Sequence, residues 1–192
     1  MFTLTKPSPA AIRRFLAEQA RLDFTYADIG ATFGNPPAGF NVDHTRQKLG
    51  SGERTFLAAT SALQKWDQLH LSWLEAGPAD TPIHPGEVVA ILARIGMLWS
   101  LNACRIVAVV DEAGQIDRFG FAYGTLPGHA EMGEERFLIE WDHAEDTVWY
   151  DILAFSRPRH PLARLGYPFA RLLQKRFARD SAAGMSRVTG IE

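Results

Sequence analysis

The stretch IDRFGFAYGTLPGHAEMGEERFLIEWDHAEDTVWYDILAFS, residues 116–156, contains three runs in which apolar and polar residues alternate. The runs cover roughly residues 116–125, 130–142 and 147–156, and turn-forming residues separate them. Within residues 135–141, one face carries Glu135, Phe137, Ile139 and Trp141, and the other carries Arg136, Leu138 and Glu140. Such alternation is typical of an antiparallel sheet that packs one face against the core.

Two more strands are predicted directly before this stretch, over residues 87–94 and 97–111. Residues 88–110 are apolar enough to resemble a membrane span, but Arg94 and Arg105 lie inside the run. An arginine at the centre of a bilayer costs about 2.5–3.5 kcal/mol on insertion scales. Paired strands are therefore the favoured interpretation, and no membrane span is predicted.

Helical spacing of apolar residues appears in three places. Ser8 followed by Pro9 resembles an N-cap with proline at the first helical position, and the pattern continues to about Leu22. A second helix is predicted over residues 53–66. The longest amphipathic pattern covers residues 161–180.

Proline and strand-forming residues indicate a helix kink and three further short strands. Pro168 lies inside the last helical pattern and is expected to kink it. Short strands are predicted over residues 24–32, 40–50 and 69–76, where β-branched or aromatic residues precede turn-forming ones.

These elements predict an α+β fold, in which a curved antiparallel β-sheet wraps around a long C-terminal α-helix, with an additional N-terminal helix. This arrangement is helix-grip-like. The concave face of such a sheet is apolar and needs a cover, and one helix rarely fills it, so we expect a cavity. The chain of 192 residues is expected to form a single domain over residues 1–192, in which residues 1–22 are a helical arm.

Composition narrows the function classes. The formal net charge of −2 argues against general nucleic-acid binding, and the one cysteine, Cys104, allows no intramolecular disulfide. The six histidines show no metal-ligand spacing, and no phosphate loop or complete dinucleotide fingerprint is present. We therefore predict no metal and no cofactor. The first residues hold no apolar signal segment, so a cytoplasmic location is expected.

The best polar cluster lies between Tyr123 and Arg136. His129 and Glu131 are two residues apart and would share one face of a strand, with Tyr123 approaching from the strand before. Such a group could move a proton. The alternative is a surface loop with a solvated histidine. Glu134, Glu135 and Arg136 are expected to form cross-strand ion pairs.

The C-terminal end is basic. From Arg157 onward eight Lys or Arg residues face only Asp180 and Glu192. This asymmetry fits an anionic partner such as a phosphate, a nucleic acid or a lipid head group. It fits the solvated face of an amphipathic helix better. Arg157 is separate, because its place between the last strand and the helix lets it reach a carboxylate or phosphate at the cavity mouth.

Several stretches together resemble one family. They are FTYADIGAT, KLGSGERTFLAATSALQKW, HPGEVVAIL, FAYGTLPGHAEMGEERF, VWYDILAFSRP and LGYPFARLLQKRFARDS. The chain is similar to the uncharacterised UPF0548 family, also called the DUF1990 domain, over residues 23–185. The resemblance implies that GTLPGHAEMGEERF is a family signature, although the family carries no established activity. The order of elements is also similar to that of the helix-grip or START-like superfamily, which includes the birch-allergen (Bet v 1-like) proteins.

Three hypotheses follow. The favoured one is binding of a small apolar or amphipathic molecule between the sheet and the C-terminal helix. An enzyme of the cyclase, isomerase or hydrolase type would use the same pocket. An interaction protein would use the basic C-terminal helix on nucleic acid or a protein partner. The candidate ligand-binding residues are Tyr123, His129, Glu131, Glu134, Tyr150 and Arg157.

Overall fold

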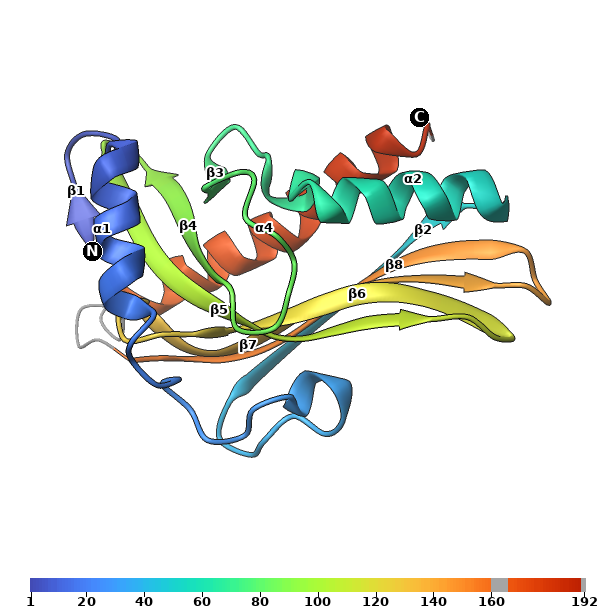
Figure 1. Ribbon diagram of the computed structural model, residues 1–192, viewed down its shortest axis with the longest axis horizontal. Helices are drawn as coiled ribbons and strands as arrows, with labels where there is room; N and C mark the ends of the chain where they lie inside the picture. Colours follow the sequence, from blue (N-terminus) through green and yellow to red (C-terminus); the bar gives the residue numbers. More distant parts are fainter. Residues whose placement is uncertain (160–165, 191–192) are drawn as a thin grey trace.

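The computed structural model describes residues 1–159 and 166–190 and contains one antiparallel sheet (Figure 1). Its strands are β1 (Phe2–Thr3), β2 (Asn41–Gly50), β3 (Leu74–Gly77), β4 (Val88–Ile95), β5 (Leu98–Glu112), β6 (Ile116–Thr125), β7 (Glu131–Asp142) and β8 (Thr147–Pro158). The helices are α1 (Pro9–Gln19), α2 (Gly52–Gln64) and α4 (Tyr167–Val188), and two short 3₁₀ helices are η1 (Ala31–Phe33) and η2 (Asp67–Leu69).

The strands lie in the order β2-β8-β7-β6-β5-β4-β3, and β1 pairs with β5. Strands β4 to β8 form a continuous meander, because each pairs with the next strand in the chain. The predicted meander is therefore confirmed, and β6 covers residues 116–125 as expected. Strand β2 closes the order by pairing with β8, which places a segment from early in the chain at the edge of the sheet.

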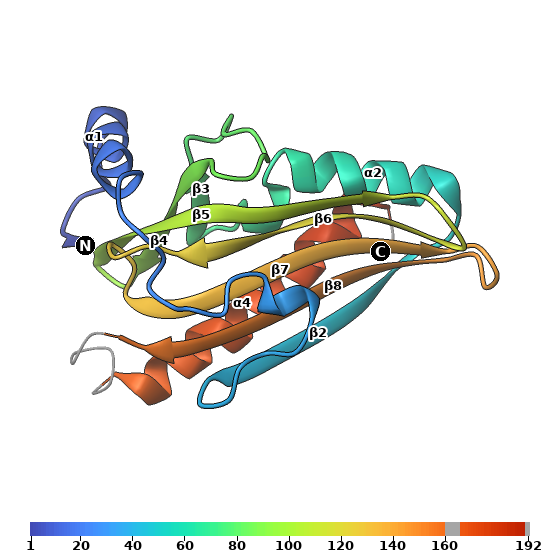
Figure 2. The same ribbon diagram turned by 60° about the horizontal axis from the view of Figure 1, so that its bottom comes forward.

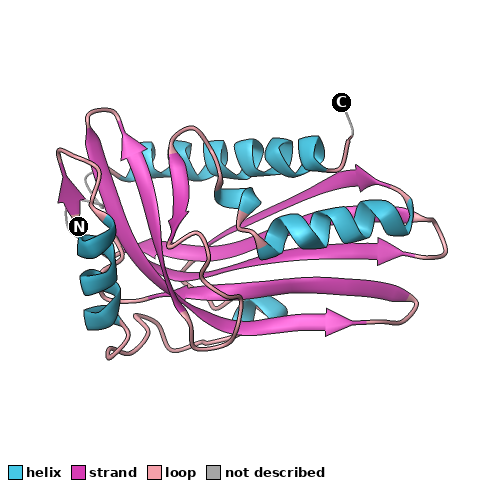
Figure 3. Cartoon of the chain, turned by 45° about the horizontal axis from the view of Figure 1, so that its top comes forward, coloured by secondary structure: helices cyan, strands magenta, loops and turns pink. Residues whose placement is uncertain are grey.

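Helices α2 and α4 cover the concave face of the sheet (Figures 1 and 3). Helix α4 runs obliquely across the strands, as Figure 2 shows from the other side. The main core lies in this layer and includes Trp66, Phe121, Phe137 and Met185. A smaller apolar cluster joins α1 to the convex face of β4 and β5. The fold class predicted from the sequence is thus confirmed: a curved sheet grips a long C-terminal helix.

The strand predicted over residues 24–32 is wrong. This segment is a loop ending in η1, and it lies on the convex face (Figure 1). The backbone N–H groups of Gly30 and Thr32 donate to the carboxylate of Glu134, so they are not available for strand pairing. Tyr26 packs edge-on against Phe155 of β8. The Glu134 side chain thus takes the place of the strand pairing that the aromatic residues of this segment suggested.

Two other expectations need correction. The strand predicted over residues 69–76 is mostly η2 and a turn, and β3 begins only at Leu74, because Trp66 turns the chain in the left-handed region with φ of 63°. Pro168 does not kink α4, because the helix begins at Tyr167 and Pro168 lies in its first turn, where a backbone N–H is not needed. The expected helix start at Pro161 lies outside the described residues.

One glycine of the opening stretch is fixed by geometry. Gly133 in β7 has a φ of +148°, and a Cβ there would lie 1.9 Å from the carbonyl oxygen of Phe155. Since both atoms belong to paired backbones, neither can move away without breaking the β7–β8 ladder.

We expect Gly133→Ala to lower the free energy of unfolding by at least about 2 kcal/mol, because the new methyl forces the backbone of β7 or β8 to shift. Gly114→Ala is the control, since a Cβ at Gly114 meets no heavy atom within 4 Å. Urea unfolding of both variants tests this. Equal stability of the two would contradict the steric account.

Candidate functional site

Tyr123 and Glu135 form a polar pair on the concave face of the sheet. The hydroxyl of Tyr123 donates to Oε2 of Glu135 over 2.8 Å, from β6 to the neighbouring strand β7. The ring of Tyr123 packs edge-on against Phe137 and tilted against Phe121, both fully buried. The pair therefore lies in aromatic surroundings, where burial raises the pKa of the Tyr123 phenol well above its ordinary value.

Glu135 is the most perturbed carboxyl on this face. The pKa of Glu135 is raised to about 7, chiefly by burial; the bond from Tyr123 opposes the shift, and the nearby carboxyls of Glu131 and Asp43 add to it. Within residues 1–159 and 166–190, no group donates a hydrogen bond to Oε1 of Glu135. This side chain is partly exposed, so one oxygen is accessible.

Glu131 lies four residues earlier on the same face of β7, beneath the first half of α4. Nε2 of Gln174 donates to both carboxylate oxygens of Glu131, over 2.8 and 3.0 Å, and also to the hydroxyl of Ser156. Burial raises the pKa of Glu131, and Gln174 and Arg171 oppose that shift. Arg171 itself forms a bidentate ion pair with Asp43 of β2.

Tyr150 of β8 lies deeper, beneath the second half of α4. Its hydroxyl and that of Ser181 share a hydrogen bond of 2.9 Å, and both residues are fully buried. The two halves of α4 differ in burial. Ser181, Ala182 and Met185 are buried, whereas Phe169 and Leu172 are 54% and 65% exposed. The second half of α4 is thus part of the core, and the first half adds polar contacts to the packing of the half-buried Leu173 and Phe177.

His129 lies in the loop between β6 and β7. Its Nδ1 accepts the backbone N–H of Glu131 over 3.0 Å, so the ring contacts the backbone of Glu131 and not its carboxylate. Burial lowers the pKa of His129 to about 4. The hydroxyl of Tyr123, which the sequence suggested would approach this ring, donates to Glu135 instead.

Glu134 lies on the convex face. Its side chain is almost fully buried and accepts four hydrogen bonds, from Tyr26, from the backbone of Gly30, and from the backbone and hydroxyl of Thr32, over 2.5 to 2.9 Å. Glu134 therefore anchors the loop over residues 24–33 to the sheet.

Arg157 is also on the convex face. Its guanidinium lies 4.5 Å from the ring centre of Phe40, and its Nε contacts the sulfur of Met132. Of the six candidate residues, the structure brings Tyr123, Glu131 and Tyr150 to the concave face and separates Glu134 and Arg157 from them.

The sequence reasoning missed Glu135. It expected cross-strand ion pairs for Glu134, Glu135 and Arg136, and only Arg136 forms one, with Asp151 over 2.6 Å. The signal was available, because the alternation places Glu135 on the same face as Phe137 and Ile139. A carboxyl group at an apolar position of a strand costs folding free energy when it is buried, and such a residue is a candidate for a functional role.

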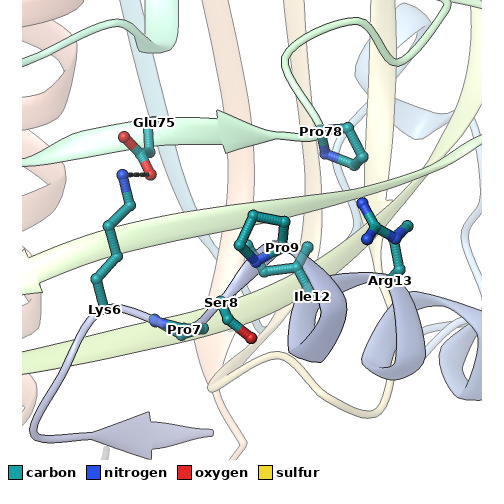
Figure 4. A pocket seen from close by; sticks show the side chains of 8 residues that line it. All are labelled: Lys6, Pro7, Ser8, Pro9, Ile12, Arg13, Glu75 and Pro78. Atoms are coloured by element: carbon teal, nitrogen blue, oxygen red, sulfur yellow. Dashed lines mark ion pairs between the residues drawn. The ribbon is translucent and has the colours of Figure 1, made fainter.

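Two hollows stand out on the described residues, and neither is lined by the Tyr123–Glu135 pair. One of about 240 Å³ lies where α4 passes β2, between Asp43 and Gln174. The other, of about 480 Å³, lies between the start of α1 and β3, and Lys6 and Glu75 form an ion pair across its rim (Figure 4). A ligand on the concave face would therefore have to displace side chains.

The described residues contain neither a metal-binding cluster nor a helix suited to cross a membrane. No group of three or more His, Cys, Asp or Glu residues within them is placed to hold a metal ion. No helix over residues 1–159 or 166–190 has the length and apolar character needed to cross a membrane.

Comparison with known proteins identifies the family and a similar fold. The family model described as a domain of unknown function, DUF1990, matches residues 25–184. A UPF0548 protein of Dictyostelium discoideum is 36% identical, covering 99% of this chain and 96% of its own, and one of Arabidopsis thaliana is 38% identical over 75% and 71%. The crystal structure of a hypothetical protein from Helicobacter pylori matches with a TM-score of 0.50 and 12% identity, covering 85% of this chain and 96% of that one, which supports the fold alone.

We expect Glu134→Ala to lower the free energy of unfolding by about 3 kcal/mol or more, because it leaves buried backbone donors of the loop unpaired. Glu145→Ala, in the exposed turn between β7 and β8, is the control and should change stability little. Chemical unfolding measures both. A loss below about 1 kcal/mol for Glu134→Ala would contradict the anchoring role.

The raised pKa of Glu135 predicts a pH-dependent contribution to stability. The folded state favours the protonated carboxyl, so the contribution is full below the ordinary pKa of 4.5 and is lost as pH rises towards about 7. Relative to Glu135→Gln, the wild-type free energy of unfolding should fall by about 3 kcal/mol across this window. Urea unfolding at a series of pH values measures the difference. Parallel profiles for the two proteins would show that Glu135 titrates normally.

Proposed function

The chain belongs to the DUF1990 family, a domain of unknown function, and we propose that it binds a small amphipathic molecule between the concave face and the first half of α4. The observation that carries this proposal is the accessible Oε1 of Glu135, which receives no hydrogen bond within the described part of the chain. A polar ligand group that donates to this oxygen would complete the site.

The surroundings of Glu135 suit the apolar part of such a molecule. Phe121, Tyr123 and Phe137 stack against one another, and Phe177 of α4 packs edge-on against Phe137. Ligand sites are commonly apolar and aromatic with a few polar groups that fix orientation. Here Glu135 and Tyr123 would orient the polar end of the ligand. Glu131 lies four residues before Glu135 on the same face of β7.

Entry of the molecule requires movement of side chains, and the first half of α4 is the part that can yield. Its polar contacts to the sheet are the bonds of Gln174 to Glu131 and of Arg171 to Asp43, and its apolar contacts come from the half-buried Leu173 and Phe177. Exposed Phe169 and Leu172 stabilise it little. Since segments with few buried apolar contacts open at the lowest free-energy cost, this half is the expected entrance.

A second candidate function is catalysis in the same place. A carboxyl with a pKa of about 7 populates both protonation states at neutral pH, which is the condition for a general acid or base. Glu135 meets this condition and His129, with its lowered pKa, does not. The hypothesis of a cyclase, isomerase or hydrolase activity therefore depends on Glu135.

The interaction reading receives less support. Arg171 is paired with Asp43, and Arg176 and Arg179 both bond Asp180 on the helix itself. These pairs reduce the positive field that α4 would offer to a nucleic acid. The cytoplasmic location expected from the sequence stays a prediction.

Native mass spectrometry of the protein purified from its own host tests the binding proposal. We expect one small molecule per chain, released by denaturing extraction. Glu135→Gln should reduce the retained amount at least tenfold, while the same change at exposed Glu145 should not reduce it. An empty wild-type protein, or equal retention by Glu135→Gln, would refute binding at this site. Conversion of the extracted molecule by wild type but not by Glu135→Gln would establish catalysis.

A further inference from the structure

Four exposed apolar side chains gather at one end of the molecule. The register of β1 on β5 places Phe2 opposite Ser100 and Thr3 opposite Trp99, and Leu4 is the first residue after β1. Phe2 is 56% exposed, Leu4 77%, Met97 86% and Leu98 41%. We call Phe2, Leu4, Met97 and Leu98 the apolar tip.

The hairpin between β4 and β5 gives no structural reason for this composition. Ile95 pairs with Leu98, so the loop consists of Gly96 and Met97 alone. Two-residue hairpin loops favour Gly, Asn and Asp, and an exposed methionine adds nothing to the turn. Met97 instead extends an apolar side chain into solvent at the outermost point of the hairpin, which is a cost unless another apolar medium receives it.

The two sequence segments that contain the apolar tip carry basic residues and no acidic ones. Residues 1–17 contain Lys6, Arg13 and Arg14 and no acidic residue, and residues 88–110 contain Arg94 and Arg105 and no acidic residue. Lys6, Arg13, Arg14 and Arg94 are exposed. Lys6 is paired with Glu75 of β3 (Figure 4). Three of the four exposed cations therefore have no ion-pair partner among the described residues.

We propose that the apolar tip inserts into the interface of an anionic lipid membrane, with Arg94, Arg13 and Arg14 contacting lipid phosphates and carboxylates. Apolar side chains that enter the headgroup region and cations that remain above it are the two elements of peripheral membrane binding. This proposal goes beyond the proposed ligand site and does not depend on it.

A second copy of the chain fits the apolar tip less well. Four side chains offer roughly a few hundred Å², whereas a stable interface buries about 800 Å² on each partner. Two tips brought together would also place their unpaired arginines near one another, and like charges repel. An anionic lipid surface has neither difficulty.

Vesicle sedimentation tests the proposal. The full chain is mixed with phosphatidylcholine vesicles, with or without phosphatidylserine, at equal total lipid. We expect binding that requires phosphatidylserine and weakens as salt rises. The double variant Leu4→Ser/Met97→Ser should bind at least tenfold more weakly, and Arg94→Glu should lose most of the preference for phosphatidylserine.

Matched changes elsewhere provide the controls. Leu57→Ser removes an exposed leucine from α2, and Arg54→Glu reverses an exposed charge there. Both variants should bind as wild type. Circular dichroism and thermal unfolding verify that each variant is folded. Absence of wild-type binding, or equal binding by the double variant, overturns the proposal. A concentration-dependent dimer that the double variant abolishes would assign the apolar tip to a second copy instead.

Discussion

Strand alternation in β7 sends two adjacent carboxyl groups to opposite faces of the sheet, and each face is organised around one of them. Glu134 points to the convex face and gathers the loop over residues 24–33 by four hydrogen bonds. Glu135 points to the concave face, and within the described residues its one hydrogen-bond donor is Tyr123. The strand cannot shift by one residue without exchanging these two environments, so the register of β7 fixes the convex cover and the interior site together.

The two glutamates differ in how many hydrogen bonds the protein donates to their carboxyl groups. Glu134 has donors for both oxygens, and a buried carboxylate with that many partners is a structural anchor. Glu135 has one donor, and burial raises its pKa to about 7. An apolar residue would fill the same position among Phe121, Phe137 and Phe177 without that cost. Violations of local rules that the rest of the structure tolerates are expected at functional sites, which is why Glu135 is the centre of the proposed site.

Sequence reasoning recovered the parts of this structure that depend on local periodicity. The alternation in residues 116–156 predicts β6, β7 and β8 closely, and Ser8 caps α1 as expected. It failed where a distant partner decides the backbone: residues 24–32 look like a strand until Glu134, some 100 residues away, takes their N–H groups. It also could not assign Arg157 to a face, because the end of β8 gives no clear alternation, and Phe40 holds that side chain on the convex side.

The proposed ligand entrance and the apolar tip lie at the same end of the molecule. The start of α4 and strand β1 lie at the same end of the long axis (Figures 1 and 2). Beside the half-buried Leu173 and Phe177, this half of α4 is held by an ion pair of Arg171 and hydrogen bonds of Gln174, and polar lipid headgroups can replace these polar contacts at no net loss of hydrogen bonds. The second half stays fixed because Ser181 and Met185 are fully buried in the core. A membrane that received the apolar tip would therefore lower the cost of moving the first half of α4 away from Glu131, and leave the grip of the sheet on the rest of the helix intact.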